Sequence, residues 1–207
     1  TTDPKTLNKD KYKISYIPNP VDESLDDMKV YENKNPEYDL FFAMSHGVHR
    51  GVLKKGKFDE RENLINYLIK KNPHLKFNIF GMNNVQPIWG DEFKKNLFNS
   101  KIALNLSQGK PLKYYSSDRI AQLIGNGIAT LVDKKTSLDK FFSNNEVIFY
   151  NSNNDLNKKL NLMVKNNNLR NNLAKKGRIK YHKKYNSTVV ADYMISKIFE
   201  VNKKFNW

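Results

Sequence analysis

The stretch from residue 102 to residue 132 reads IALNLSQGKPLKYYSSDRIAQLIGNGIATLV. It begins with the apolar run Ile102–Leu106 and ends with a second apolar run, Ala129–Val132. Between them, Ser117–Gly125 carries apolar residues at helical spacing, and the pair Asn126-Gly127 that follows is typical of a helix end. Strand, helix and strand in this order predict one unit of a parallel α/β sheet.

The same alternation extends through most of the chain. Each predicted strand is a run of four or five largely apolar residues, as expected of strands that are buried on both faces of a sheet. The predicted strands are 40–44, 77–80, 102–106, 129–132 and 147–150, and the predicted helices are 59–71, 91–99, 117–125, a short turn at 137–142 and the segment from 155 onward. We therefore predict an α/β fold, a Rossmann-like three-layer α/β/α domain with a mostly parallel sheet of five to six strands.

Three segments of the chain are expected. Residues 1–24 form a lead-in with a short first strand at Lys13–Ile17, which Pro18 and Pro20 would stop because a proline cannot donate to a strand ladder. Residues 25–186 form the Rossmann-like domain. Residues 187–207 form a C-terminal helix, in which five apolar residues recur at helical spacing: Val190, Met194, Ile198, Val201 and Phe205.

The composition excludes several classes of protein. The 207 residues are 39% hydrophobic, which argues against a disordered chain, and they include no cysteine. Disulfides, cysteine-bound zinc, iron–sulfur clusters and thiol catalysis are therefore excluded. No apolar run approaches the ~20 residues of a membrane-spanning helix. No signal-peptide pattern opens the chain, so we expect a cytoplasmic protein, and we interpret the start at Thr1 instead of Met as a sign of a longer parent.

The net charge of +15 has two interpretations. One is an anionic partner. The other is a coding drift toward lysine and asparagine, because only five of the 36 basic residues are arginine, the usual residue for bidentate phosphate and base contacts. The basic residues are spread along the chain, so nucleic-acid binding is not expected, whereas peripheral contact with an anionic membrane stays open.

The segment after the first predicted strand of the sheet, 45–57, is rich in glycine and basic residues. Glycines allow close backbone approach to a ligand, and the cations suit a phosphate. Gly51–Lys57 nearly matches a P-loop, but Phe58 stands where that motif needs Ser or Thr. The alternatives are a plain surface turn and a metal site at His46 and His49, which lack a convincing third ligand.

The segment after the strand at 102–106 carries the strongest ligand-binding pattern. Ser116 and Ser117 stand at a helix start, where free N–H groups and the helix dipole attract anions. Arg119 lies in the first turn and can clamp a diphosphate. Tyr114 or Tyr115 could stack on a base. The alternative is ordinary helix capping beside an aromatic pair that covers the core.

Several segments, taken in order, resemble the group 1 glycosyltransferases of the GT-B fold. Residues Tyr16–Asp22 resemble the interdomain entry of that family. Residues Ser117–Asp133 resemble its donor-site helix and following strand, most closely in the spore-maturation-protein-like subgroup. Leu138–Tyr150 and the basic segment near Gly177 are similar in style. The resemblance covers the chain from Ile14 to about Phe199.

This resemblance implies a hexosyl or related glycosyltransferase whose C-terminal, nucleotide-sugar-binding half is the present chain. The acceptor-binding half would lie upstream, would hold any catalytic base, and would pack against the final helix. Catalytic residues therefore stay unknown, and we expect the isolated chain to bind nucleotide weakly and to transfer little sugar. The implied role is cell-envelope polysaccharide biosynthesis at the inner membrane face, since many sugar acceptors are lipid-linked.

The resemblance also implies roles for individual residues. The donor diphosphate would meet Arg119, Ser116, Ser117, Arg50 and Lys54. Gln122 stands where the family has an acidic residue on the ribose hydroxyls, with Tyr114 or Tyr115 beside the base. No Asp-x-Asp pair occurs in the chain, so we expect a metal-independent reaction with no cofactor besides the nucleotide-sugar substrate.

Two other functions remain open at this stage. A basic module could dock on anionic lipid or nucleic acid, and its binding would then fall steeply with salt. A degenerate, non-catalytic relative could serve only in binding or assembly, and Gln122 in place of an acid is the feature that raises this alternative.

Overall fold

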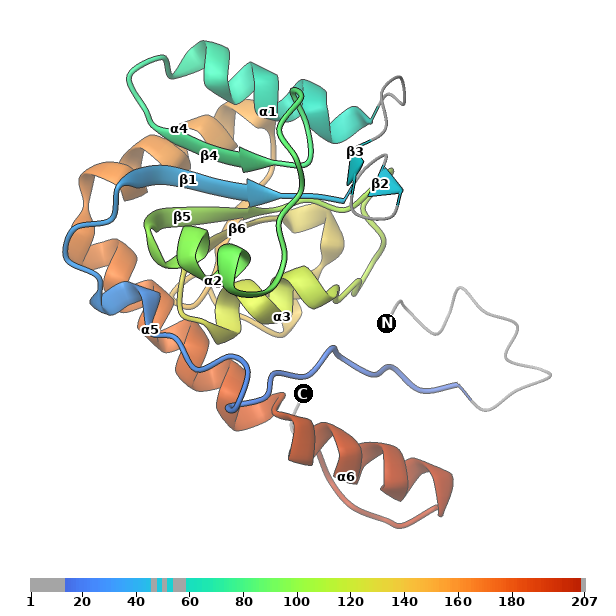
Figure 1. Ribbon diagram of the computed structural model, residues 1–207. Helices are drawn as coiled ribbons and strands as arrows, with labels where there is room; N and C mark the ends of the chain where they lie inside the picture. The colour runs from blue at the N-terminus through green and yellow to red at the C-terminus, as the bar shows by residue number, and fades with distance from the viewer. Residues whose placement is uncertain (1–13, 46–47, 50–51, 54–58, 206–207) are drawn as a thin grey trace.

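The protein is described by a computed structural model that covers residues 14–45, 48–49, 52–53 and 59–205. Five strands form one sheet in which every neighbouring pair is parallel, in the order β4-β1-β5-β6-β7 (Figure 1). The strands are β1 (Tyr38–Ala43), β4 (Phe77–Phe80), β5 (Ser100–Asn105), β6 (Ala129–Asp133) and β7 (Ile148–Tyr150). A separate antiparallel pair consists of β2 (Val48–His49) and β3 (Val52–Leu53).

Helices cover both faces of this sheet. The helices are α1 (Glu60–Lys71), α2 (Gly90–Phe98), α3 (Asp118–Gly125), α4 (Asn153–Lys165), α5 (Asn167–Lys184) and α6 (Ser187–Ile198), with 3-10 turns η2 (Val30–Glu32), η3 (Lys134–Thr136) and η4 (Leu138–Lys140). Helices α1 and α4 lie on one face, and α2 and α3 lie on the other (Figure 1). The predicted three-layer α/β/α architecture is confirmed.

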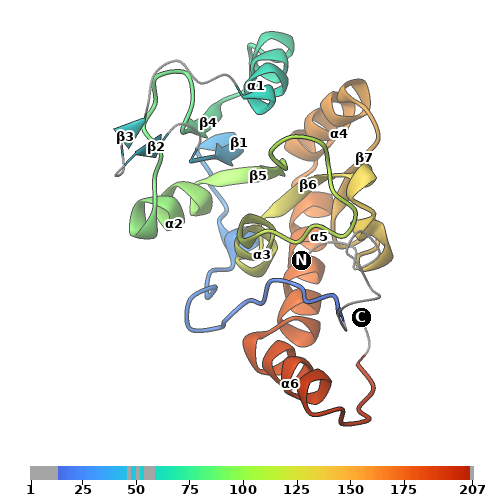
Figure 2. The same ribbon diagram turned by 90° about the vertical axis from the view of Figure 1, so that its right-hand side faces the viewer.

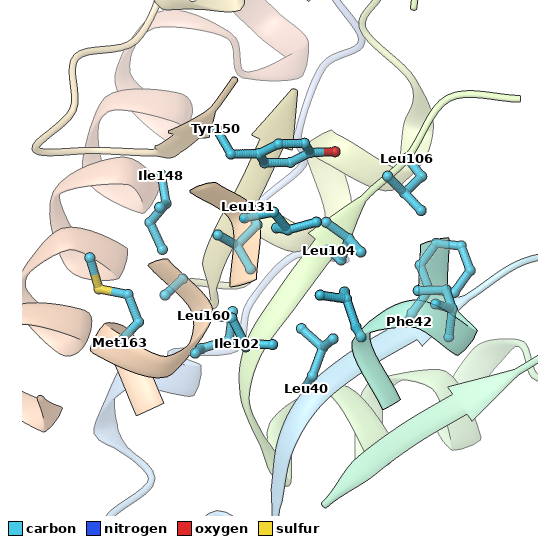
Figure 3. Close-up of a cluster of buried hydrophobic side chains, with 14 of the residues drawn as sticks. Leu40, Phe42, Ile102, Leu104, Leu106, Leu131, Ile148, Tyr150, Leu160 and Met163 are labelled. Atoms are coloured by element: carbon cyan, nitrogen blue, oxygen red, sulfur yellow. The ribbon is translucent and has the colours of Figure 1, made fainter. Parts of the chain in front are cut away.

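The core explains why the strands are apolar along their length. Leu40 and Leu104 point toward α1 and α4, into the cluster drawn in Figure 3. Their neighbours Phe41 and Ala103 point the other way and pack with Leu97 of α2. Successive side chains alternate between faces, so a strand covered on both faces needs an apolar residue at nearly every position.

Helix α3 begins and ends as its sequence predicts. The backbone N–H of Ile120 donates to the hydroxyl of Ser117, which is the N-cap. At the other end, Gly127 has φ +73°, a backbone conformation that L side chains rarely adopt. The helix therefore starts at the carboxyl edge of the sheet, and the chain enters β6 a few residues after the helix ends.

The lead-in differs from the prediction at its expected first strand. Residues 14–17 are not a strand and lie outside the sheet. Side chains hold this segment in place instead, since Tyr16 stacks on Phe141 with the ring centres 5.3 Å apart. Pro18 and Pro20 have no N–H to contribute to a ladder, which is consistent with the lack of pairing.

Val21 closes the lead-in against the end of α5. Its N–H donates to the carbonyl oxygen of Tyr185 over 3.0 Å, and its carbonyl accepts from the N–H of Ser187 over 2.8 Å. Val21 also forms an isolated parallel bridge with Asn186 and is fully buried. The start of the described chain and the junction of α5 with α6 are therefore joined by backbone hydrogen bonds.

The C-terminal helix is shorter than expected. Helix α6 ends at Ile198, and Glu200 has φ +56°, which turns the tail back. Phe205 then reaches Tyr193, with ring centres 5.1 Å apart. Three of the predicted apolar positions are exposed, namely Met194 (41%), Ile198 (69%) and Val201 (56%). None of the helices among the described residues is long and apolar enough to cross a membrane.

Candidate functional site

A cleft of about 480 Å³ opens at the carboxyl edge of the sheet, between α2 and α3. Figure 2 faces this edge, with α2 and α3 below the strands. The cleft is lined by the segments that follow β1 and β4, by the first half of α2, by α3 from its first residue to its C-cap, and by two residues that precede η2: Leu25, Asp26, Ala43, Met44, Ser45, Pro87, Ile88, Trp89, Gly90, Phe93, Lys94, Asp118, Arg119, Gln122 and Asn126. Ligands of parallel α/β sheets bind at this edge.

Arg119 is fixed in the cleft wall by two backbone carbonyls. Its Nε donates to the carbonyl oxygen of Ala43 over 3.1 Å, and its Nη1 donates to the carbonyl oxygen of Leu106 over 2.7 Å. The guanidinium also lies over the ring of Phe42, 5.5 Å from its centre. One side chain on α3 therefore bridges the ends of β1 and β5.

The charge of Arg119 is oriented by these contacts without being neutralised by them. Carbonyl oxygens are uncharged acceptors, and within the described part of the chain Nη2 donates to no protein atom. Burial, followed by repulsion from Arg61, lowers the pKa of Arg119 to about 10, so the group is still protonated at pH 7. A half-buried, pre-oriented cation of this kind favours an anionic ligand.

Gln122 lies one helical turn after Arg119 and lines the same cleft. Its side chain is exposed, and the part of the chain that the structure describes offers it no hydrogen-bond partner. Its backbone carbonyl accepts from the side-chain amide of Asn126 over 2.8 Å. An amide that faces the cleft can both donate to and accept from a hydroxyl-bearing ligand.

Trp89 is a cleft residue that the sequence analysis did not single out. It precedes the first residue of α2 and is 53% exposed, so part of its indole is accessible to a ligand. It is one of only two tryptophans in the chain and falls in the segment after β4. A tryptophan in the segment after a predicted parallel strand was the signal available in the sequence.

The two predicted serines occupy different environments. Ser117 caps α3 beside Arg119, as described above. Ser116 is buried, and its hydroxyl oxygen accepts the backbone N–H of Asn19 over 3.1 Å. The side chain of Asn19 donates to the carbonyl of Ser116 and to the carboxylate of Asp118. The lead-in therefore engages Ser116, which does not line the cleft.

The structure separates the two predicted tyrosines. Tyr115 is half-buried and is an electrostatic neighbour of Arg119. Tyr114 lines a second groove, which neither Arg119 nor Gln122 lines. Its ring packs edge-on against Tyr16 and Phe141 instead. Of the predicted residues that the structure describes, Arg119 and Gln122 line the cleft, whereas Ser116, Ser117, Tyr114 and Tyr115 do not.

The basic residues expected from the first loop are not covered by the structure. Arg50 and Lys54 lie outside the described residues, as do His46 and nearly all of the P-loop-like segment. The neighbouring strand pair of β2 and β3 follows β1 and so begins from the same edge of the sheet as the cleft. The roles of Arg50 and Lys54 in phosphate binding stay predictions.

Two carboxylates also reach the cleft, and both have partners. Asp118 accepts from Asn19 over 2.9 Å. Asp26 accepts the backbone N–H of Asp22 and the amide of Asn126, and burial raises its pKa above the ordinary range. Among the described residues, no group of three histidine or acidic side chains is placed to hold a metal ion.

The family of the chain follows from its sequence. Residues 60–196, more than half of the chain, match the model of the glycosyl transferase-like family. The protein belongs to this family, which confirms the resemblance found in the sequence. The matched region runs from the start of α1 into α6 and includes Arg119 and Gln122. A comparison with curated proteins gives no match.

Solved structures show the same fold in one domain of larger proteins. Sucrose-phosphate synthase from Thermosynechococcus elongatus has a TM-score of 0.62 at 11% identity, over 93% of this chain and 53% of that one. An S. aureus TarM mutant, solved with fondaparinux, α-GlcNAc-glycerol and UDP, has a TM-score of 0.57 at 16% identity, over 90% and 40%. Anabaena HepE, solved with UDP, has a TM-score of 0.50 at 8% identity, over 68% and 37%. The chain spans about half or less of these proteins, and its fold is the Rossmann-like half of a GT-B enzyme.

Proposed function

We propose that this chain is the donor-binding half of a glycosyltransferase and that it holds a nucleotide-diphosphate sugar in the cleft between α2 and α3. The observation that carries the proposal is the placement of Arg119 and Gln122. They lie one turn apart on α3, at the carboxyl edge of the sheet, and line the same cleft. One supplies a fixed positive charge and the other an uncommitted amide, the two kinds of group that a nucleoside diphosphate needs.

The diphosphate would lie against Arg119 and the first turn of α3. In the transfer, an acceptor hydroxyl oxygen forms a bond to the anomeric carbon of the sugar and gives its proton to a base, which is expected in the upstream half. The bond between the anomeric carbon and a diphosphate oxygen breaks, and its electron pair stays with that oxygen. The growing negative charge would be stabilised by Arg119 and by the N–H groups that follow Ser117. Because the two carbonyls already hold the guanidinium in place, little reorganisation is needed as charge develops. Arg50 and Lys54 are proposed to add charge from the first loop, and no metal ion is assigned.

The nucleoside would extend from the diphosphate along α3. Gln122 would bond the ribose hydroxyls, with weaker bonds than a carboxylate gives because the amide is uncharged. Trp89 would offer an exposed indole face for the base at the other wall of the cleft. Tyr115 does not line the cleft and is an electrostatic neighbour of Arg119. Two structural relatives were solved with UDP, so uridine nucleotides are the first to test.

The experiment is a thermal-shift and calorimetry panel of UDP, GDP, ADP and their sugars, each with magnesium or with a chelator. We expect one base to raise the melting temperature by a few degrees and the chelator to leave the shift unchanged. Arg119→Ala should remove the shift. Arg119→Lys, which keeps the charge, should retain part of it if the variant with alanine proves too unstable to compare. A panel in which no nucleotide changes the melting curve, while heparin or anionic vesicles do, would replace this proposal with a surface-binding module.

A second proposal concerns the membrane. Four apolar residues near the end of α6 are more than half exposed, namely Ile195, Ile198, Phe199 and Val201, and Lys204 follows them. The family resemblance assigns the final helix to packing against the upstream half, and exposed apolar side chains beside lysines are also typical of a helix that lies at an anionic membrane surface. The acceptor, on this proposal, is a glycan or lipid-linked sugar at the cytoplasmic face. Sedimentation with vesicles of anionic and of zwitterionic lipid tests it, since only the anionic vesicles should carry the protein down.

A further inference from the structure

A groove of about 330 Å³ lies between the lead-in and the C-terminal helix and tail. It shares no lining residue with the α2–α3 cleft. One wall consists of Tyr16, Tyr114 and Phe141, and the other of Tyr193 and Phe205. Lys197 and Lys203 complete the lining. Three parts of the chain that are far apart in sequence thus supply five aromatic rings and two cations to one depression.

The first wall is a tightly packed aromatic cluster. Tyr16 stacks on Phe141 with ring planes 19° apart, and Tyr114 meets both rings edge-on with centres 6.1 Å and 5.3 Å away. Burial raises the pKa of Tyr16 well above its usual value, so its phenol stays neutral at physiological pH. This wall therefore presents apolar ring surface with neutral hydroxyls.

Tyr114 is held in that wall by an unusual backbone conformation. Its φ is +60°, the left-handed region, which a bulky side chain rarely adopts. Its N–H donates to the carbonyl oxygen of Thr136 over 2.7 Å and fixes this conformation. Conformations of this kind are concentrated at ligand sites, where the surrounding structure keeps them in place.

The opposite wall carries the charge. The ammonium of Lys197 lies 5.4 Å from the ring centre of Tyr193, and that of Lys203 lies 5.7 Å from that of Phe205. Lys203 also pairs with Asp192, whereas Lys197 forms no ion pair with any described residue. The described residues that line the groove include no carboxylate. Among the described residues, the groove is therefore lined by aromatic rings on both walls and by two lysines on one side.

We propose that this groove binds an anionic sugar, a hexose or short glycan that carries a carboxylate or phosphate, at a site separate from the acceptor site of the upstream half. The choice of a sugar rests on the proposed glycosyltransferase function. The C–H groups on the face of a pyranose pack against aromatic rings, and its hydroxyls can bond the tyrosine hydroxyls. The anionic group pairs with Lys197, whose charge is the least compensated in the groove. The volume suits a short segment of glycan.

The test uses NMR titration of the full 207-residue chain with cellobiouronic acid and with neutral cellobiose. We expect the acidic disaccharide to bind at least tenfold more tightly and to shift the resonances of Tyr193 and Lys197. Lys197→Ala/Lys203→Ala should weaken this binding about tenfold. Lys158→Ala/Lys175→Ala, which removes the same charge from exposed positions on α4 and α5, should leave it unchanged. Octyl glucuronide, compared with glucuronic acid, distinguishes a lipid-linked sugar from a free one.

A second variant distinguishes the contribution of the aromatic wall to binding from its contribution to the stability of the fold. Tyr114→Asn removes the ring but keeps a residue that tolerates the left-handed conformation, so binding should fall while the melting temperature is largely kept. The proposal is overturned if the neutral disaccharide binds as well as the acidic one, if the lysine pair makes no difference, or if UMP shifts the groove resonances more than the sugar acid does. UDP binding at the α2–α3 cleft is measured on the same samples, so a failure there is distinguishable from a failure here.

Discussion

Arg119 donates a hydrogen bond of 2.7 Å from Nη1 to the backbone carbonyl of Leu106, so the first turn of α3 is fastened to the chain that leaves β5. The same guanidinium reaches the carbonyl of Ala43 at the end of β1. An arginine assigned to ligand binding thus also holds two central strand ends together. Its loss would affect the shape of the cleft as well as its charge, and the two effects need separate measurements.

Replacing Arg119 by lysine separates the structural role of this side chain from the role of its charge. Lysine keeps the positive charge, but a single ammonium does not reproduce the planar fork that reaches two carbonyls. We expect a loss of about 2 kcal/mol in the free energy of unfolding, which for a domain of this size lowers the melting temperature by about 4–8 °C. Gln122→Ala, one turn further along the same exposed helix face, should change stability by less than about 0.5 kcal/mol. Equal melting temperatures for Arg119→Lys and the native chain would show that the two carbonyl bonds contribute nothing.

Gln122→Glu tests the proposed ribose contact. A carboxylate accepts stronger hydrogen bonds from the ribose hydroxyls than an amide does. We expect the dissociation constant of the preferred nucleoside diphosphate to fall several-fold, measured by calorimetry, while the inorganic diphosphate, which has no ribose, gains nothing. Gln122→Ala should weaken the nucleotide and spare the diphosphate. If both variants bind the nucleotide as the native chain does, the ribose does not lie on α3.

Gly81 at the end of β4 is required by its surroundings. A Cβ at this position would lie 1.7 Å from the carbonyl oxygen of Met44, which lines the cleft, and φ is +81°. Gly81→Ala should therefore destabilise the fold by about 3 kcal/mol or more in urea unfolding. Gly109 is the matched control, because its φ is +68° but no atom lies within 4 Å of the added Cβ. Gly109→Ala should cost about 1 kcal/mol, from the backbone conformation alone.

The ion pair of Lys180 and Glu146 makes a pH-dependent contribution to the free energy of unfolding. Burial alone would raise the pKa of Glu146, but hydrogen bonds from Lys180 and from the backbone of Ser143 outweigh it and hold the pKa below the ordinary 4.5. A carboxyl group with a depressed pKa contributes its full stabilisation when the pH is above its ordinary pKa. This stabilisation is lost as the pH falls through the lower pKa of the folded state. Lys180→Met keeps the aliphatic chain and should cost about 1 kcal/mol at pH 7.

The same variant should cost less at pH 3 than at pH 7, because pH 3 lies below the ordinary carboxyl pKa of 4.5 and the stabilisation is lost as the pH falls toward and through the lower, folded value. Free energies of unfolding from urea titrations at the two pH values measure the difference. A penalty that is as large at pH 3 as at pH 7 would assign it to packing on Phe142, over which the ammonium lies at 5.4 Å, and not to the ion pair.

The architecture was predictable because the sheet is buried on both faces. The five strands fall within two residues of their predicted bounds, since a strand covered by helices must be apolar at almost every position. The start of α3 was predictable from Ser117, which caps it in the structure. Local pattern and local chemistry agree in these elements, and each is decided by residues close together in sequence.

Other features depend on contacts between distant residues and were not predictable in this way. Tyr16 was expected in a strand, but its place is decided by Phe141, more than a hundred residues away. The carbonyl partners of Arg119 belong to two other segments, and no pattern around residue 119 indicates them. Tyr114 was grouped with Tyr115 because they are neighbours, yet a left-handed φ sends it to another groove. Glu200 likewise ends the expected final helix early through its own φ.

The backbone hydrogen bonds of Val21 to Tyr185 and Ser187 have a mechanical consequence. They lie where the lead-in meets the junction of α5 and α6, so a force on the lead-in would reach α6 directly. Ahead of Val21, Asn19 bonds Ser116 and Asp118 at the start of α3. The same force would therefore also reach the helix that carries Arg119, and the cleft is mechanically coupled to the entering chain.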